Sequence, residues 1–200
     1  FDISLNTNVR RFRACIPDKS TVTVTDDKIK INNFEFIIGH NDEGQFDADL
    51  YTDKATTFTL EHGGGTMSKF PKIKFSKLIS TTVNFNGAWP AETNPANFKL
   101  IFAHTQYQFN LNINTENVPA QFDNVQMSFN VVSSQNSVKV YGLFNVASEE
   151  YHEMTISGPE KGAINFIGGI GVDYKSWIKI LNPITVTISE VSLTDTSRTE

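Results

Sequence analysis

Near its middle the chain reads Gln106-Tyr107-Gln108-Phe109-Asn110-Leu111-Asn112-Ile113, with a polar residue at every even number and an apolar or aromatic one at every odd number. A period of two is typical of a β-strand with one buried face. Shorter stretches such as Phe34-Glu35-Phe36 repeat it, and turn-forming clusters such as Gly63-Gly64-Gly65 lie between them. No helical stripe longer than two turns occurs. The sequence therefore predicts an all-β protein with very little helix.

Alternating segments of this kind occur along the whole chain. We expect strands over 1–5, 10–16, 21–25, 28–38, 56–60, 72–75, 79–85, 98–103, 106–113, 125–132, 138–146, 152–156, 163–167, 177–180 and 184–193. Short strands separated by frequent turn signals are typical of a sandwich or barrel, and no sequence repeat of about 20 to 50 residues is visible. We therefore predict an antiparallel, jelly-roll-like β-sandwich.

The last of these segments is the most regular. Pro183 precedes an apolar series over 184–193 whose phase shifts by one at Ser189 and Glu190, which are both polar. A β-bulge at that point would return all the apolar residues to one face. We therefore expect one long closing strand with a bulge.

Length and composition favour a single domain. A chain of 200 residues with 39% hydrophobic residues can bury a core without disulfides. We predict one domain over 1–200, with a weak alternative boundary inside the polar, glycine-rich interval 39–65. Because the chain begins with Phe1, we expect a domain cut from a longer protein or a processed form.

Charge and composition also bear on partners. The net charge of −5 argues against nucleic-acid binding, which depends on Lys and Arg neutralising phosphates. No apolar run reaches the roughly 18 residues of a membrane-spanning helix. The basic stretch over 10–13 is interpreted as an exposed edge strand protected by charge, with a partner-binding or processing site as the alternative. Cys15 has no partner for an internal disulfide and is expected to be a small buried residue.

The densest acidic cluster lies at 41–53. Asp42, Glu43, Asp47 and Asp49 are candidate Ca²⁺ ligands, because hard cations prefer oxygen ligands, although the spacing is not that of an EF-hand. A solvated acidic loop without metal is the alternative. Calcium is the one cofactor that the sequence suggests, and no cofactor is certain.

Trp89 is the candidate ligand-binding residue. It is flanked by turn formers, so its ring could stand exposed as a stacking platform for a sugar, with Asn86, Glu92 and Asn94 as hydrogen-bonding neighbours. The alternative is that Trp89 closes one end of the core. Trp177, which lies between Ser176 and Ile178, is interpreted as a core residue.

No pattern predicts catalysis. The chain has no zinc-binding histidine spacing, no closely paired carboxylates on one strand, and no Gly-x-Ser-x-Gly turn, so we expect no catalytic residues and no enzyme. The residues identify no protein family. The complete absence of Asn-x-Ser/Thr acceptors favours a bacterial, phage or viral protein over one matured in a eukaryotic secretory pathway.

Three functions remain open. The leading hypothesis is a non-enzymatic, surface-displayed module for attachment or assembly, of viral or phage fibre or capsid type or of bacterial adhesin or pilus type. We expect it outside the cell or on a virion, to recognise a protein or glycan receptor on a cell surface, and to form a homo-oligomer, with a trimer favoured. The alternatives are a lectin-like carbohydrate-binding module of a larger secreted enzyme, and a jelly-roll polysaccharide hydrolase or lyase.

Overall fold

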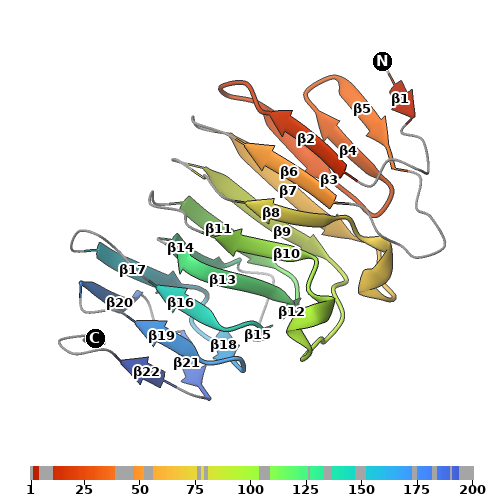
Figure 1. The fold of residues 1–200 in the computed structure, drawn as a ribbon. Helices are drawn as coiled ribbons and strands as arrows, with labels where there is room; N and C mark the ends of the chain where they lie inside the picture. The colour runs from red at the N-terminus through yellow and green to blue at the C-terminus, as the bar shows by residue number, and fades with distance from the viewer. Residues whose placement is uncertain are drawn as a thin grey trace.

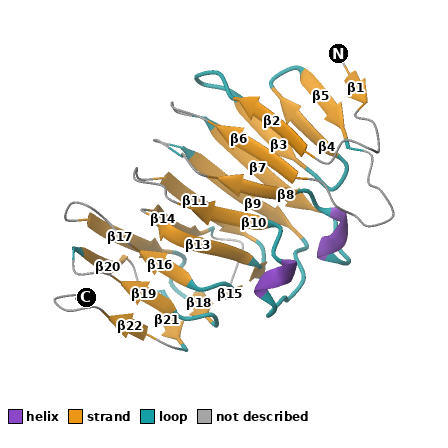
Figure 2. Cartoon of the chain, viewed as in Figure 1, coloured by secondary structure: helices purple, strands orange, loops and turns teal. Residues whose placement is uncertain are grey.

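The chain forms a β-solenoid, in which successive strands stack side by side along one axis (Figure 1). The computed structural model describes residues 2–4, 11–38, 47–51, 56–75, 78, 81–103, 109–125, 127–132, 137–146, 152–172, 175–181, 184–189 and 191–193. Within these ranges nearly all regular structure is strand, and two short 3-10 helices are present (Figure 2).

The strands form three sheets. Sheet A contains, in spatial order, β1 (Asp2–Ser4), β5 (Phe34–Ile37), β4 (Lys28–Ile31), β3 (Thr21–Val24), β7 (Thr57–His62), β9 (Thr82–Gly87), β11 (Phe109–Asn114), β14 (Met127–Val131), β17 (His152–Ser157) and β20 (Ser176–Leu181). Sheet B contains β2 (Arg11–Cys15), β6 (Asp47–Tyr51), β8 (Lys72–Phe75), β10 (Leu100–Ala103), β13 (Ala120–Val125), β16 (Phe144–Val146), β19 (Ile170–Val172) and β22 (Val191–Leu193). Sheet C contains β12 (Asn117–Val118), β15 (Ser137–Val140), β18 (Ala163–Phe166) and β21 (Thr185–Ile188), and the 3-10 helices are η1 (Met67–Lys69) and η2 (Pro95–Asn97).

The path of the chain makes the pairing parallel. From β6 to β11 the chain alternates between sheets B and A, and from β11 onward each coil visits sheets A, C and B in turn. Each strand therefore pairs with the equivalent strand of the coils before and after it. Among the described pairs, only β3 with β4 and β4 with β5 are antiparallel.

The prediction of an antiparallel, jelly-roll-like β-sandwich is therefore wrong, although the all-β class is confirmed. Alternation of polar and apolar residues shows that a strand has one buried face, but it is the same for parallel and antiparallel partners. The repeat was also hidden in the sequence. From β11 onward, successive strands of sheet A begin at Phe109, Met127, His152 and Ser176, so the coils differ in length and their residues differ in identity.

The predicted closing strand over 184–193 is two strands. β21 pairs in sheet C and β22 pairs in sheet B. The phase shift interpreted as a bulge falls where the chain leaves sheet C after β21 and enters sheet B at β22, and Glu190 lies outside the described residues. A change of sheet shifts the phase of the apolar residues just as a bulge would.

The core lies between the sheets and is rich in phenylalanine. Phe102 stacks on Phe75 and on Phe122, with ring centroids 4.8 and 5.1 Å apart and interplanar angles of 12° and 11°. These rings lie on the neighbouring strands β8, β10 and β13 in register, so each of these three strands adds one ring to a continuous stack. Offset stacking of this kind stabilises aromatic pairs beyond the area that they bury.

The N-terminal edge of sheet B is β2, so Arg11 and Arg13 lie on an edge strand, as the sequence suggested. Cys15, at the end of the same strand, is exposed, and the expectation of a buried cysteine is wrong. Sheets A and B also pass through the interval 39–65, because β6 and β7 lie in it and pair with strands on both sides. Among the described residues, no helix is long and apolar enough to cross a membrane.

Successive coils approach one another closely at the corner between sheets C and B. A Cβ atom on Gly142 would lie 1.9 Å from the carbonyl oxygen of Ala120 in the preceding coil, and one on Gly168 would lie 2.4 Å from the carbonyl oxygen of Tyr141. The Tyr141 hydroxyl donates to Asn117 Oδ1 at 3.1 Å, and burial raises the pKa of the Tyr141 phenol, which keeps this donor protonated. Only glycine fits at these two corner positions.

This corner yields the first prediction. Gly142→Ala should lower the free energy of unfolding by about 2 kcal/mol or more, because the new methyl group overlaps backbone that cannot rotate away. Gly171→Ala is the matched control, since its Cβ would meet only the Asn145 side chain, at 3.0 Å. Urea unfolding followed by circular dichroism measures both. Equal losses in the two variants would contradict a backbone clash at Gly142.

Candidate functional site

The candidate site is the outward surface of sheet A, which we call the polar face. It consists of two rows of side chains that cross six neighbouring strands, from β3 to β17. The outer row contains Thr21, Thr57, Thr82, Asn110, Ser128 and Thr155. The ladder row contains Thr23, Thr59, Asn84, Asn112, Asn130 and Ser157.

The alternation of side chains along each β-strand places these residues outward. Their neighbours along each strand, such as Phe58 and Leu111, are fully buried, so the residues on either side of them must point away from the core. None of the residues in the two rows is buried. Because the strands are parallel and in register, equivalent positions in successive coils fall beside one another.

Side chains of the ladder row bond to one another across the strands. Asn112 Nδ2 donates to Asn84 Oδ1 at 3.0 Å, and Asn130 Nδ2 donates to Asn112 Oδ1 at 3.2 Å. The Ser157 hydroxyl continues the series by donating to Asn130 Oδ1 at 3.1 Å. In the outer row, the Thr155 hydroxyl donates to the Ser128 hydroxyl at 2.8 Å. These bonds fix the rotamers of the polar groups and so hold the array in one arrangement.

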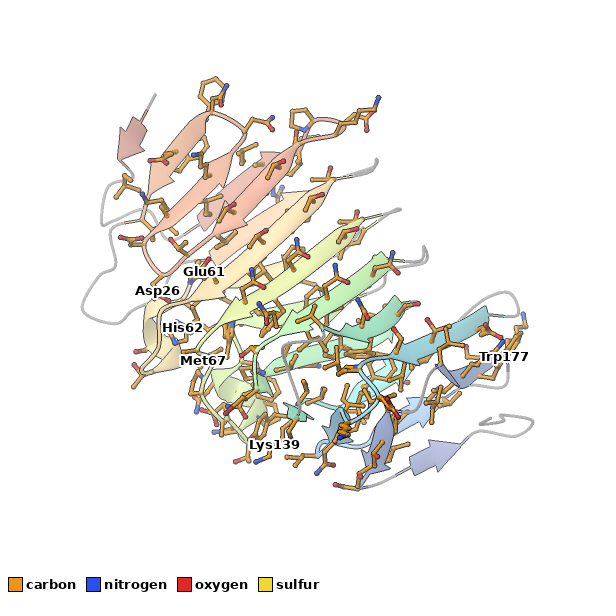
Figure 3. The ribbon with its side chains drawn as sticks, turned by 180° about the vertical axis from the view of Figure 1, so that it is seen from behind. Asp26, Glu61, His62, Met67, Lys139 and Trp177 are labelled. Carbon is orange, nitrogen blue, oxygen red and sulfur yellow. The ribbon has the colours of Figure 1, made fainter. Side chains whose placement is uncertain are left out.

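Every member of the two rows is neutral, and charged groups lie at the ends or the margin. At the N-terminal end, Lys28 and Lys30 both approach Glu35 at 3.6 Å. At the margin beside the ladder row, Glu61 pairs in register with Asn86 and is exposed (Figure 3). The polar face is therefore a neutral strip of hydroxyl and amide groups.

At the C-terminal end the strip meets an aromatic side chain. Trp177 lies on β20, the last strand of sheet A, and is in register with Glu153 on β17 (Figure 3). Its indole Nε1 donates to Glu153 Oε2 at 3.1 Å, and Lys179 Nζ lies 3.8 Å from the same oxygen. Trp177 is half-buried and Lys179 is exposed. An indole beside a paired carboxylate and ammonium is a combination that can bind a sugar ring.

The structure does not leave Trp89 as an exposed platform. Its side chain is only 3% exposed, and its ring packs on Phe70 and Phe85, with centroids 4.6 Å from each. The indole Nε1 donates to the backbone carbonyl of Asn86 at 2.6 Å. This placement agrees with the alternative interpretation, in which Trp89 fills the core.

The three residues predicted to accompany Trp89 are not gathered around a shared ligand position. Asn86 lies on β9 and is partly exposed beside Glu61. Glu92 accepts hydrogen bonds from the Asn94 backbone at 2.8 Å and from Asn97 Nδ2 at 3.1 Å. Asn94 caps η2 by accepting from the backbone N–H of Ala96. Glu92 and Asn94 therefore organise the loop around η2.

The calcium prediction falls partly outside the described residues, which include neither Asp42 nor Glu43. Asp47 and Asp49 lie on β6, where their register partners are all cationic. Asp47 pairs with Arg11 and Lys72, and Asp49 pairs with Arg13 and Lys74. The backbone register therefore places both aspartates beside cationic residues of the two neighbouring strands. Within the described ranges, no group of three or more His, Cys, Asp or Glu could hold a metal ion.

A buried histidine lies at the far end of β7. The His62 side chain is fully buried, its Nδ1 contacts Asp26 Oδ1, and its ring lies 5.1 Å from that of Trp89. The other oxygen of Asp26 accepts from the Gly63 backbone at 3.0 Å. Together these contacts tie the turn between β3 and β4 to the loop that follows β7 (Figure 3). This pair was not predicted, because residues 36 apart in sequence give no local signal.

The outward position of Trp177 could have been predicted from the alternation of side chains along the strand. It is two residues from Lys175 and two from Lys179, and residues two apart on a strand share a face. The ladder row could have been recognised only if the parallel register had been known.

Comparison with family models, with curated proteins and with solved structures finds no match to this chain.

The ladder row yields the second prediction. Asn112→Ala should lower the free energy of unfolding by about 1–2 kcal/mol, because it removes hydrogen bonds to two neighbouring strands. Asn110→Ala is the matched control on the same strand and face, where Asn110 is exposed, and it should change stability by less than about 0.5 kcal/mol. Urea unfolding of both variants measures the difference. A ladder that contributes nothing would leave the two variants equally stable.

Proposed function

We propose that this protein is a non-enzymatic attachment module that binds a glycan through the polar face. The observation that carries the proposal is the bonded series from Asn84 through Asn112 and Asn130 to Ser157. It presents neutral donors and acceptors on four neighbouring strands, in an arrangement fixed before any ligand arrives. The hydroxyl groups of a sugar are donors and acceptors of the same kind.

Rigidity supports binding by such a surface. A ligand that binds a preorganised array loses its own freedom but does not have to immobilise the side chains of the protein as well. Asn112 and Asn130 each use one donor and one acceptor within the row, and Asn84 uses one acceptor. Each of these amides therefore keeps further hydrogen-bonding capacity for a ligand or an ordered water. The strip is neutral, which favours a neutral glycan over a phosphate backbone.

The proposed function implies a location and an oligomeric state. An attachment module acts outside a cell or on a virion, and we propose that location, together with a homo-oligomer, with a trimer favoured, that multiplies weak contacts with a receptor surface. The net charge of −5 accords with the expectation that nucleic acid is not a partner.

A second candidate is binding of the polar face to ice. The observation that favours it is the pair of strands β3 and β7, each of which carries threonine in both rows, at Thr21 and Thr23 and at Thr57 and Thr59. Threonine offers a methyl and a hydroxyl group, and a repeating array of both on a rigid sheet can order water at a regular spacing. Shaping of ice crystals by the purified protein, in the absence of any glycan binding, would favour this candidate.

The third prediction tests the proposed function. Asn110→Lys places a long charged side chain in the centre of the polar face and should weaken glycan binding by about tenfold or more, because the charge must be desolvated under the ligand. Thr187→Lys is the matched control, since Thr187 is exposed on β21 of sheet C and should retain wild-type binding. The measurement is binding to a printed glycan array and to insoluble cellulose and chitin, after circular dichroism has shown that both variants fold.

Two outcomes would contradict the proposal. Equal loss of binding in Asn110→Lys and Thr187→Lys would place the site elsewhere. Release of shortened sugars from any polysaccharide in the panel would favour the alternative of a hydrolase or lyase.

A further inference from the structure

We infer that the glycan is an unbranched, neutral polysaccharide chain that lies across the strands, parallel to the solenoid axis, with a sugar stacked on Trp177. This inference rests on the proposed function and adds the ligand class, its direction and its anchoring residue.

The shape of the polar face gives the direction. Along each strand the outer row and the ladder row are about 7 Å apart, and on β7, β9 and β11 a third outward position follows, at Glu61, Asn86 and Asn114. Across the strands it continues over six neighbours, and strands are spaced by about 4.8 Å, so the strip is roughly 24 Å long. A long, narrow strip of repeating groups matches a linear polymer laid along it. One sugar of an extended chain is close to one strand spacing in length, so successive sugars meet equivalent groups.

The hydrogen bonds within the polar face also favour a ligand that lies across the strands. The ladder from Asn84 to Ser157 and the bond from Thr155 to Ser128 all run from strand to strand. A ligand laid along a single strand would meet only two or three outward polar groups before the strand ends. A branched glycan would carry substituents beyond the strip, over the charged margin at Glu61.

Trp177 lies beside the end of the strip, one outward position beyond the outer row. Lys179 is the register partner of Thr155 and so closes the outer row, and Trp177 is two residues before it on the same strand and face. The indole can cover the apolar face of a sugar, while Glu153 and Lys179 offer an acceptor and a donor beside it. Because Glu153 and Lys179 are paired, the end of the strip adds little net charge, which again favours a neutral sugar.

The fourth prediction is a dependence on chain length. Titration calorimetry of the full chain would use linear β-1,4-linked oligosaccharides of glucose, mannose and N-acetylglucosamine, about two to six sugars long. We expect the pentasaccharide of the recognised series to bind about tenfold or more tightly than the disaccharide, because each added sugar engages a further strand at high effective concentration.

Substitutions at two positions, one beside the C-terminal end of the strip and one farther along it, test the inference. Trp177→Ala should weaken binding of every length by about tenfold, whereas Trp177→Phe, which keeps a stacking ring, should stay within about threefold of wild type. Thr82→Lys lies four strands from β20 in sheet A, about 19 Å away, and should weaken only the longer oligosaccharides, by about fivefold or more. Thr187→Lys on sheet C is again the control and should change nothing.

The outcomes distinguish this inference from the proposed function. Affinity that does not depend on length, or a disaccharide that loses as much affinity as the pentasaccharide in Thr82→Lys, would overturn the inference and leave glycan binding intact. Binding only of branched or charged glycans on the array would do the same. Failure of every glycan to bind would overturn both.

Discussion

In-register parallel pairing is the constraint on which the rest of this structure depends. Each strand of sheet A lies beside the equivalent strand of the coils before and after it, so a residue that faces inward must have inward neighbours on both sides. Val83, Leu111 and Phe129 illustrate this on three successive strands, and all three are fully buried. The same registry aligns Asn84, Asn112 and Asn130 on the outside. The continuous core and the continuous polar face are thus two results of one pairing rule.

The sequence could predict those features that depend on one strand at a time. Alternation at Phe109-Asn110-Leu111-Asn112 identifies a strand and separates its buried residues from its outward residues, and the structure agrees at each position. Pairing direction is not a property of one strand. Nor is the passage from sheet C to sheet B between β21 and β22, which shifts the phase of the apolar residues just as a bulge in one strand would. Coil lengths that vary, with few residues repeated between coils, removed the signal that would have indicated a solenoid.

The two tryptophans show that prediction from sequence had the same limit at the candidate site. Trp89 follows turn formers, and its local sequence is that of an exposed loop, yet it packs on Phe70 and Phe85 because the loop folds back over the core. Trp177 stands between Ser176 and Ile178 in a largely apolar segment and resembles a core residue, but it shares a strand face with Lys179 and lies outward on the last strand of sheet A. Strand parity was the more reliable signal, because it follows from backbone geometry, whereas the burial of a loop depends on packing between distant segments.

A surface built by repetition also determines how it can bind. Each strand contributes only one or two neutral hydrogen-bonding groups, and a hydrogen bond exchanged with water stabilises a complex only modestly. Useful affinity must therefore come from many equivalent contacts made by one ligand, which requires that the ligand repeat at a spacing that the strands can follow. A small ligand could occupy any pair of strands in the middle of the strip equally well. Trp177 breaks that equivalence because it lies at one end, so it is the residue that can fix where along the solenoid a repeating ligand begins.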